Sequence, residues 1–188
     1  MRIVVSGTHC SGKSTLVSDF LAAHRDYTHE PEPWEWLVEV YNESMPEEPD
    51  GAGFYRQLEV SVERLRTYRR TAQLIAERCP LDFLAYILAL DDLGRDRQAM
   101  QLVEPAVELA HLGMEQIDLL IVLPLNHADG IEVPESEDPE LRDAMNDRLL
   151  DLIASNDYDL LGTSQRVVEV RGGRKQRLGA LERAIGSG

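Results

Sequence analysis

The chain has 188 residues, 43% of them hydrophobic and 28% charged, a composition that is ordinary for a globular protein with a real core. Its 19 basic and 34 acidic side chains leave a formal net charge of −15, which argues against a broad nucleic-acid surface or an anionic-membrane surface, since either needs clustered positive charge. Cys10 and Cys79 have no metal-ligand spacing, and neither a signal peptide nor a membrane-spanning run is recognisable. We therefore expect one domain over residues 1–188 in a cytoplasmic compartment.

The first predicted elements are a strand, a phosphate-binding loop and a helix. Residues 3–5 are a short apolar run, and residues 7–14 match the pattern G-x-x-x-x-G-K-[ST] at every fixed position. Apolar residues then recur at helical spacing to about His24. Because this helix begins at the loop, the positive end of its dipole faces bound phosphates. The context favours a nucleoside triphosphate site over a structural turn.

Each fixed position of the loop has a chemical reason. Gly7 and Gly12 permit backbone angles that let consecutive N–H groups point at phosphate oxygens. Lys13 supplies a point charge for the β- and γ-phosphates, and the Ser14 hydroxyl can ligate Mg²⁺. The residues expected to hold ATP here are Gly7, Thr8, His9, Cys10, Ser11, Gly12, Lys13, Ser14 and Thr15.

The next segment predicts a second strand and a stiff connection. Residues 27–29 are a short strand candidate. Pro31 and Pro33 fix φ and push the residue before each of them towards extended geometry, so residues 30–36 are expected to be non-helical. Residues 39–53 are acidic, contain Pro and Gly, and are expected to form an exposed loop.

A carboxylate in this stiff segment is a candidate general base. Glu32 lies between the two prolines, and a carboxylate near the γ-phosphate can accept the proton of an attacking hydroxyl. Glu30 and Glu35 are rivals on spacing alone. Trp34 either lines an acceptor pocket or packs in the core.

Residues 54–70 predict an amphipathic helix with a second, polar face. Gln57, Ser61, Arg64 and Tyr68 recur at i, i+4, i+7 and i+11, so they share one side of that helix. On the residues alone, this stripe fits a solvated surface and a pocket wall equally.

The third predicted strand ends in a charged pair. Residues 72–76 are a buried-strand candidate, and Glu77 and Arg78 follow it at the end where open α/β sheets bind ligands. Glu77 is suited to hold Mg²⁺ or its waters, and Arg78 to neutralise the transferring phosphoryl group; the alternative is a surface ion pair. Pro80 suits the first turn of a buried helix that ends near Gly94.

The remainder of the chain continues the alternation of helices and strands. The predicted elements are a helix at 98–112 with a kink or break at Pro105, a strand at 118–123, an acidic loop at 126–140, a helix at 139–154, a strand at 166–170, a closing helix to 185 and a disordered tail at 186–188. Strands that alternate with helices and read as near-continuous apolar runs indicate an α/β fold with a parallel sheet covered on both faces.

Together these motifs resemble the deoxyribonucleoside kinases. The resemblance covers residues 3–37 and 54–90 and rests on four groups: Gly7 to Ser14, Pro31-Glu32-Pro33, Phe54-x-x-Gln57 with Arg64, and Glu77-Arg78. It implies a P-loop nucleoside triphosphate hydrolase fold with about five parallel strands. It also implies Glu32 as the base for a nucleoside 5′-hydroxyl, and Gln57 and Arg64 as readers of the nucleobase. The 19-residue spacing from Lys13 to Glu32 favours Glu32 over Glu30.

The expected lid departs from that family. Deoxyribonucleoside kinases have an Arg-rich lid after the fourth strand, whereas residues 126–140 carry six acids and no Lys or Arg. The segment 77–86 is also similar to small P-loop ATPases related to ribosylnicotinamide kinase. In those, arginines on the next helix form the lid, which implies Arg142 and Arg148 as ATP contacts in a lid at 126–150. Residues 170–174 would flank adenine.

The sequence therefore favours an ATP- and Mg²⁺-dependent kinase that phosphorylates a hydroxyl of a nucleoside or nucleoside-like molecule. The expected catalytic residues are Glu32, Lys13 and Arg78, the acceptor contacts Gln57, Arg64 and Trp34, and the metal ligands Ser14 and Glu77. The alternatives are an ATPase switch that acts through a protein partner, and a kinase for an antibiotic or a nucleotide monophosphate. The sequence fixes neither the acceptor, nor ATP over GTP, nor the oligomeric state, for which a homodimer is one option.

Overall fold

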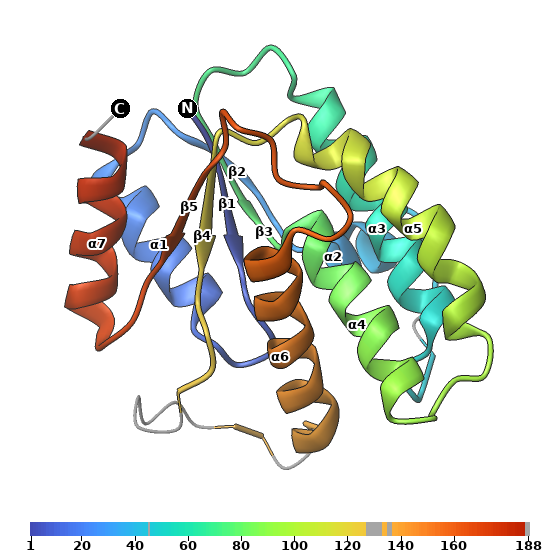
Figure 1. Ribbon diagram of the computed structural model, residues 1–188. Helices are drawn as coiled ribbons and strands as arrows, with labels where there is room; N and C mark the ends of the chain where they lie inside the picture. Colours follow the sequence, from blue (N-terminus) through green and yellow to red (C-terminus); the bar gives the residue numbers. More distant parts are fainter. Residues whose placement is uncertain (45, 127–132, 135–136, 187–188) are drawn as a thin grey trace.

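The computed structural model describes residues 1–44, 46–126, 133–134 and 137–186. Its centre is a five-stranded parallel sheet in the order β2-β3-β1-β4-β5 (Figure 1). The strands are β1 (Arg2–Ser6), β2 (Thr28–Glu30), β3 (Leu74–Glu77), β4 (Leu119–Val122) and β5 (Arg166–Glu169). The predicted α/β fold with about five parallel strands is confirmed.

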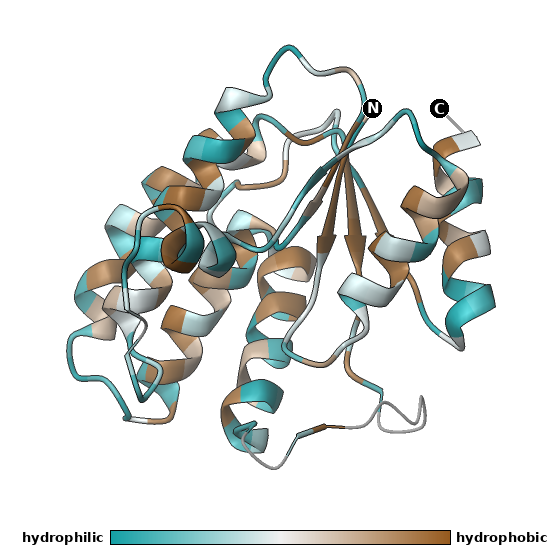
Figure 2. Cartoon of the chain, turned by 180° about the vertical axis from the view of Figure 1, so that it is seen from behind, coloured by the Kyte–Doolittle hydropathy of each residue, from teal (hydrophilic) through white to brown (hydrophobic). Residues whose placement is uncertain are grey.

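Helices cover both faces of the sheet because alternate residues of the central strands point to opposite sides. In β1, Val4 packs into one hydrophobic cluster, while Ile3 and Val5 pack into the other. The helices are α1 (Lys13–Ala23), α2 (Pro33–Glu39), α3 (Gly51–Thr67), α4 (Pro80–Asp92), α5 (Ala99–Met114), α6 (Pro139–Ser155) and α7 (Arg174–Gly186). Helices α1 and α7 lie on one face and α3 to α6 on the other (Figure 1). The central strands are the brown, hydrophobic middle of Figure 2.

The topology brings three functional segments to one edge of the sheet. The carboxyl ends of parallel strands lie on the same side, and ligands bind there in open α/β sheets. The phosphate loop follows β1, Glu32 follows β2, and Arg78 follows β3. The strand order places β3 between β1 and β2, so Arg78 emerges between the loop and Glu32.

The segment after β2 is not the non-helical stretch that its prolines predicted. Helix α2 begins at Pro33, because a proline at the first helical position needs no N–H partner and has a φ that suits the helix. Residues 30–32 stay non-helical as predicted, and Glu32 has an extended backbone with φ −61° and ψ 141°. The predicted loop at 39–53 is also shorter, since Asp50 accepts a hydrogen bond from the Gly53 N–H and caps α3.

Helix α5 runs unbroken through Pro105, where a kink or break was predicted. Burial of Val103, Ala106 and Ala110 on its inner face offsets the hydrogen bond that the proline removes. Gly186 is the last residue of α7, so the predicted tail at 186–188 does not begin there. The parts of the predicted loops and tail that lie outside the described residues are Met45, 127–132, 135–136 and 187–188. In the described ranges, none of the helices is long and apolar enough to cross a membrane.

Candidate active site

The loop between β1 and α1 has the curvature that a phosphate cradle requires. Gly7 has φ +147° and Gly12 has φ +91°, both in a region that disfavours residues with a Cβ. A Cβ at position 7 would lie 2.7 Å from the carbonyl oxygen of Leu123. Cys10 adopts φ +51° without being a glycine, so the loop holds a third residue in a left-handed conformation.

Two buried polar atoms at this edge have no hydrogen-bond partner in the described part of the chain. They are Ser11 Oγ in the loop and Arg142 Nε on α6. Burial lowers the pKa of His9 and raises that of Cys10, and the charge of Arg142 contributes to lowering both, so its guanidinium faces the loop. A buried hydroxyl oxygen and a buried guanidinium nitrogen without partners fit an anionic ligand such as the phosphates of ATP.

Glu32 lies between two buried cations. Its Oε2 accepts a hydrogen bond from Arg78 Nε at 3.1 Å, and its Oε1 lies 3.5 Å from Lys13 Nζ. Burial favours the neutral acid, but the charges of Arg78 and Lys13 prevail and lower the pKa of Glu32 to about 2. The structure therefore brings the predicted base, Glu32, to the predicted phosphate-binding Lys13.

Arg78 connects Glu32 to the phosphate loop. Its side chain is 2% exposed, and its Nη1 donates to the Gly7 carbonyl at 3.1 Å. Its backbone has φ +72°, an unfavourable conformation for a residue with a Cβ. Such strain persists where surrounding contacts hold the residue in place, and it is common in ligand sites.

A hydroxyl and a carboxylate meet at the start of α1. Ser14 Oγ donates to Glu77 Oε2 at 2.7 Å, and His29 Nε2 lies 3.1 Å from Glu77 Oε1. Two protein oxygens beside bound phosphates match what Mg²⁺ takes in nucleotide sites, where water and phosphate complete the octahedron. Ser14 and Glu77, both predicted metal ligands, therefore fit Mg²⁺.

A cavity of about 400 Å³, here called the second cavity, opens beside Glu32. Gln57 and Trp34, both predicted to contact the acceptor, line it. Gln57 is only 9% exposed, and its side chain has no hydrogen-bond partner in the described ranges. The complete lining is His9, Glu32, Trp34, Pro46, Glu47, Pro49, Asp50, Gly53, Phe54, Gln57 and Glu137.

Two arginines expected in the site lie elsewhere. Arg64 pairs with Glu30 through Nε at 2.9 Å and stacks on Trp36, with its guanidinium 3.7 Å from the ring centroid. It is absent from the lining of the second cavity. Arg148 pairs with Asp92 at the end of α4. Of the two predicted lid arginines, only Arg142 acts on the loop.

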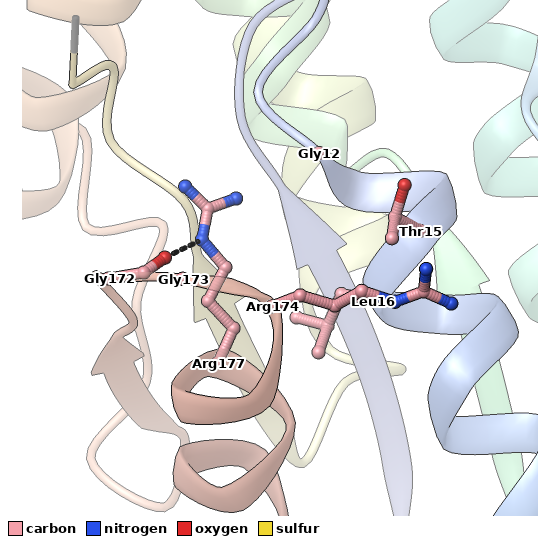
Figure 3. Close-up of a pocket in the computed structure, with 7 residues that line it drawn as sticks. All are labelled: Gly12, Thr15, Leu16, Gly172, Gly173, Arg174 and Arg177. Atoms are coloured by element: carbon pink, nitrogen blue, oxygen red, sulfur yellow. Dashed lines mark hydrogen bonds between the residues drawn. The ribbon is translucent and has the colours of Figure 1, made fainter. Parts of the chain in front are cut away.

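A smaller cavity, of about 170 Å³, lies between α1 and the start of α7 (Figure 3). Thr15 and Leu16 form one wall, and Gly172 and Gly173, in the stretch expected to flank adenine, form the other (Figure 3). Arg177 joins the two walls, because its Nη1 donates to the Ser11 carbonyl at 2.6 Å and its Nε donates to the Gly172 carbonyl at 2.7 Å.

Several residues of the site were missed from the sequence. The hydroxyl of Tyr86, buried under the loop, accepts from the His9 N–H at 3.2 Å. Asp82 accepts from the hydroxyl of Ser6 and from the Cys79 N–H, and so ties the end of β1 to α4. Both are polar side chains in an otherwise apolar helical run, a signal that could have found them. Arg177 and His29 carry no such signal.

A family model described as an AAA domain matches residues 2–177. No curated protein matches the chain. Among solved structures, deoxyadenosine kinase from M. mycoides with bound dATP has a TM-score of 0.67 at 15% identity, and the alignment covers 99% of this chain and 100% of that one. Thymidylate kinase from Candida albicans has a TM-score of 0.67 at 18% identity, with 98% and 90% covered.

The NadR protein in complex with NR has a TM-score of 0.68 at 16% identity. That alignment covers 98% of this chain and 51% of the NadR chain, so the chain spans about half its length. These likenesses show the P-loop nucleoside triphosphate hydrolase fold. They also confirm the resemblance predicted from the motifs, since a deoxyadenosine kinase is among the structures that match.

Proposed function

We propose that this chain, which belongs to the AAA domain family, is a kinase that transfers the γ-phosphoryl group of ATP to a hydroxyl of a nucleoside or nucleoside-like molecule. One observation carries the proposal. Glu32 lies between Lys13 of the phosphate loop and a cavity whose other walls include Gln57 and Trp34. A carboxylate at the boundary between a phosphate site and a small-molecule cavity is placed for an acceptor hydroxyl.

The donor side uses the phosphate loop. In this proposal the loop N–H groups and Lys13 bind the phosphates, and Arg78 stabilises the charge of the transferring group. Ser14 and Glu77 would hold Mg²⁺, which neutralises phosphate charge when bound. Arg142 would contact the phosphates from α6. We also propose that residues 1–188 form a single kinase domain.

Glu32 performs the proton transfer. The acceptor hydroxyl gives its proton to the carboxylate as its oxygen bonds to the γ-phosphorus, and the bond from that phosphorus to the oxygen of ADP breaks. Arg78 and Lys13 hold the pKa of Glu32 near 2, which makes it a weak base while both cations pair with it. Once phosphates attract Lys13 and Arg78, burial dominates and the pKa of Glu32 rises. Base strength is thus coupled to donor binding.

A coupled ADP-release assay over a panel of nucleosides and small alcohols tests the proposal. We expect at least one acceptor to stimulate ADP release, and Lys13→Ala to abolish the stimulation because it removes the phosphate-binding charge. ADP release that is the same with and without every acceptor would contradict a kinase and favour a nucleotide-hydrolysing switch.

A further inference from the structure

The second cavity has an unusual balance of charge. Four carboxylates line it, from Glu32, Glu47, Asp50 and Glu137. None of the residues that line it in the described part of the chain is a lysine or an arginine. A cavity with one sign of charge attracts ligands of the opposite sign and repels those of its own.

Three of these carboxylates lack a cationic partner in the described ranges. Glu32 is compensated by Lys13 and Arg78, but the side chain of Glu47 has no partner, and that of Asp50 only caps α3. Glu137 lies 3.4 Å from His9 Nδ1. Burial, followed by the charges of Arg78 and Lys13, lowers the pKa of His9 to about 3, so this imidazole is neutral near pH 7.

Other features make the cavity a ligand site rather than an acidic surface. Gln57 is nine-tenths buried as a residue, its amide has no hydrogen-bond partner in the described ranges, and it lines the same cavity as the carboxylates. A buried amide left unpaired is costly unless a ligand or water satisfies it. Trp34, 43% exposed, adds an aromatic surface, and aromatic rings attract cations.

We infer that the acceptor is an alcohol that carries a positive charge and no phosphate. This inference rests on the proposed kinase function and names the class of its acceptor. The positive charge can come from a cationic ring or from a protonated amine, since either is attracted by Glu47, Asp50 and Glu137. A nucleotide monophosphate would bring like charge into the cavity and find no basic side chain there.

Matched acceptors that differ in charge test the inference. 1-Methyladenosine is cationic near pH 7, whereas its isomer N6-methyladenosine is neutral and has the same 5′-hydroxyl. Glucosamine and N-acetylglucosamine form the corresponding pair for a protonated amine, and AMP is the phosphorylated acceptor. With ATP and Mg²⁺, we expect the cationic member of at least one pair to have a kcat/KM about tenfold above its neutral partner, and AMP to be inactive.

A variant of a residue in the cavity wall tests whether the cavity causes the preference for cationic acceptors. Glu47→Gln removes an exposed carboxylate from the wall, and it should reduce the cationic-to-neutral ratio of kcat/KM about threefold to fivefold, the usual strength of an exposed charge pair. Glu48→Gln is the matched control, because Glu48 is exposed and does not line the cavity. It should leave the ratio unchanged.

The outcomes separate this inference from the proposed function. Equal or better use of the neutral members, or of AMP, would overturn charge selection while the kinase function stands. If the cationic-to-neutral ratio of kcat/KM fell equally in Glu47→Gln and Glu48→Gln, the net charge of the protein and not the cavity would set the preference. That result would also overturn the inference. If no acceptor of any charge stimulates ADP release, the proposed function fails and the inference fails with it.

Discussion

Glu32 carries most of the proposed chemistry at the scale of single residues. Its two flanking prolines made it a candidate, and the resemblance to deoxyribonucleoside kinases favoured it over Glu30 by its distance from Lys13. The structure places its carboxylate 3.5 Å from Lys13 Nζ. The sequence did not predict the second partner, Arg78, as a contact of Glu32, because the two are 46 residues apart and meet only once β2 and β3 pair. The spacing of residues along the chain does not predict contacts that depend on the order of the strands in the sheet.

Glu32→Gln is expected to lower acceptor-stimulated kcat by about 10²–10⁴-fold, the usual contribution of a general base. ATP should still bind, and should bind more tightly, because Lys13 and Arg78 no longer have a competing carboxylate. Steady-state kinetics and calorimetric titration of a non-hydrolysable ATP analogue measure the two effects. Glu35→Gln is the control, three residues along the same segment and outside the cavity lining. A kcat for Glu32→Gln within threefold of the wild type would remove Glu32 as the base.

The same carboxylate predicts a pH dependence of stability. The pKa of Glu32 is lowered from an ordinary 4.5 to about 2 in the folded chain. Its stabilising effect is therefore fully present above about pH 4.5 and is lost as the pH falls towards 2. The difference in unfolding free energy between the wild type and Glu32→Gln should shrink by about 3 kcal/mol over that window. Urea unfolding at a series of pH values measures it, and a difference that is constant from pH 7 to 3 would refute the buried pairing.

At the scale of elements, Arg64 holds α2 and the end of β2 against α3. Its guanidinium pairs with Glu30 and stacks on Trp36, so one side chain of α3 contacts both elements that flank Glu32. The sequence placed Arg64 on the correct helix face but assigned it to the acceptor. The period of a helix shows which residues share a face, not which neighbour covers each turn of that face.

Arg64→Met is expected to lower the free energy of unfolding by about 3 kcal/mol, because it leaves the buried Glu30 carboxylate unpaired. Chemical denaturation measures the loss. The double variant Glu30→Gln/Arg64→Met should recover part of it, since no unpaired charge remains. If Arg64→Met instead raised the KM of the acceptor at full stability, a direct role in acceptor binding would be restored.

Helix α7 is tied to the phosphate loop through Arg177. This side chain donates to carbonyl groups on both sides of the smaller cavity, at Ser11 and Gly172. Arg177→Met should weaken ATP binding about tenfold, because each lost charged hydrogen bond is worth about 1.5–3 kcal/mol and the loop adjusts in part. Calorimetric titration with ATP measures the change. Arg183→Met, on the exposed part of the same helix, is the control, and equal losses in both variants would contradict the tie.

At the scale of the whole molecule, the fold class could be predicted from the alternation of strands and helices along the sequence. Apolar strands alternate with helices, and this predicted the parallel sheet and its two covered faces. The strand order could not be predicted from the sequence. This order places the loop, Glu32 and Arg78 beside one another at one edge of the sheet. The overall charge of −15 argued against a broad surface for polyanions, but the gathering of four carboxylates around the second cavity appears only in three dimensions.

The central claim is that the phosphoryl group goes to a small-molecule hydroxyl and not to water. The fate of the label of γ-³²P-ATP, followed by chromatography with an acceptor that stimulates ADP release, tests it most directly. We predict a labelled acceptor formed one-for-one with ADP, and its loss in both Lys13→Ala and Glu32→Gln. Label that appears only as inorganic phosphate, at a rate unchanged in Glu32→Gln, would contradict the account.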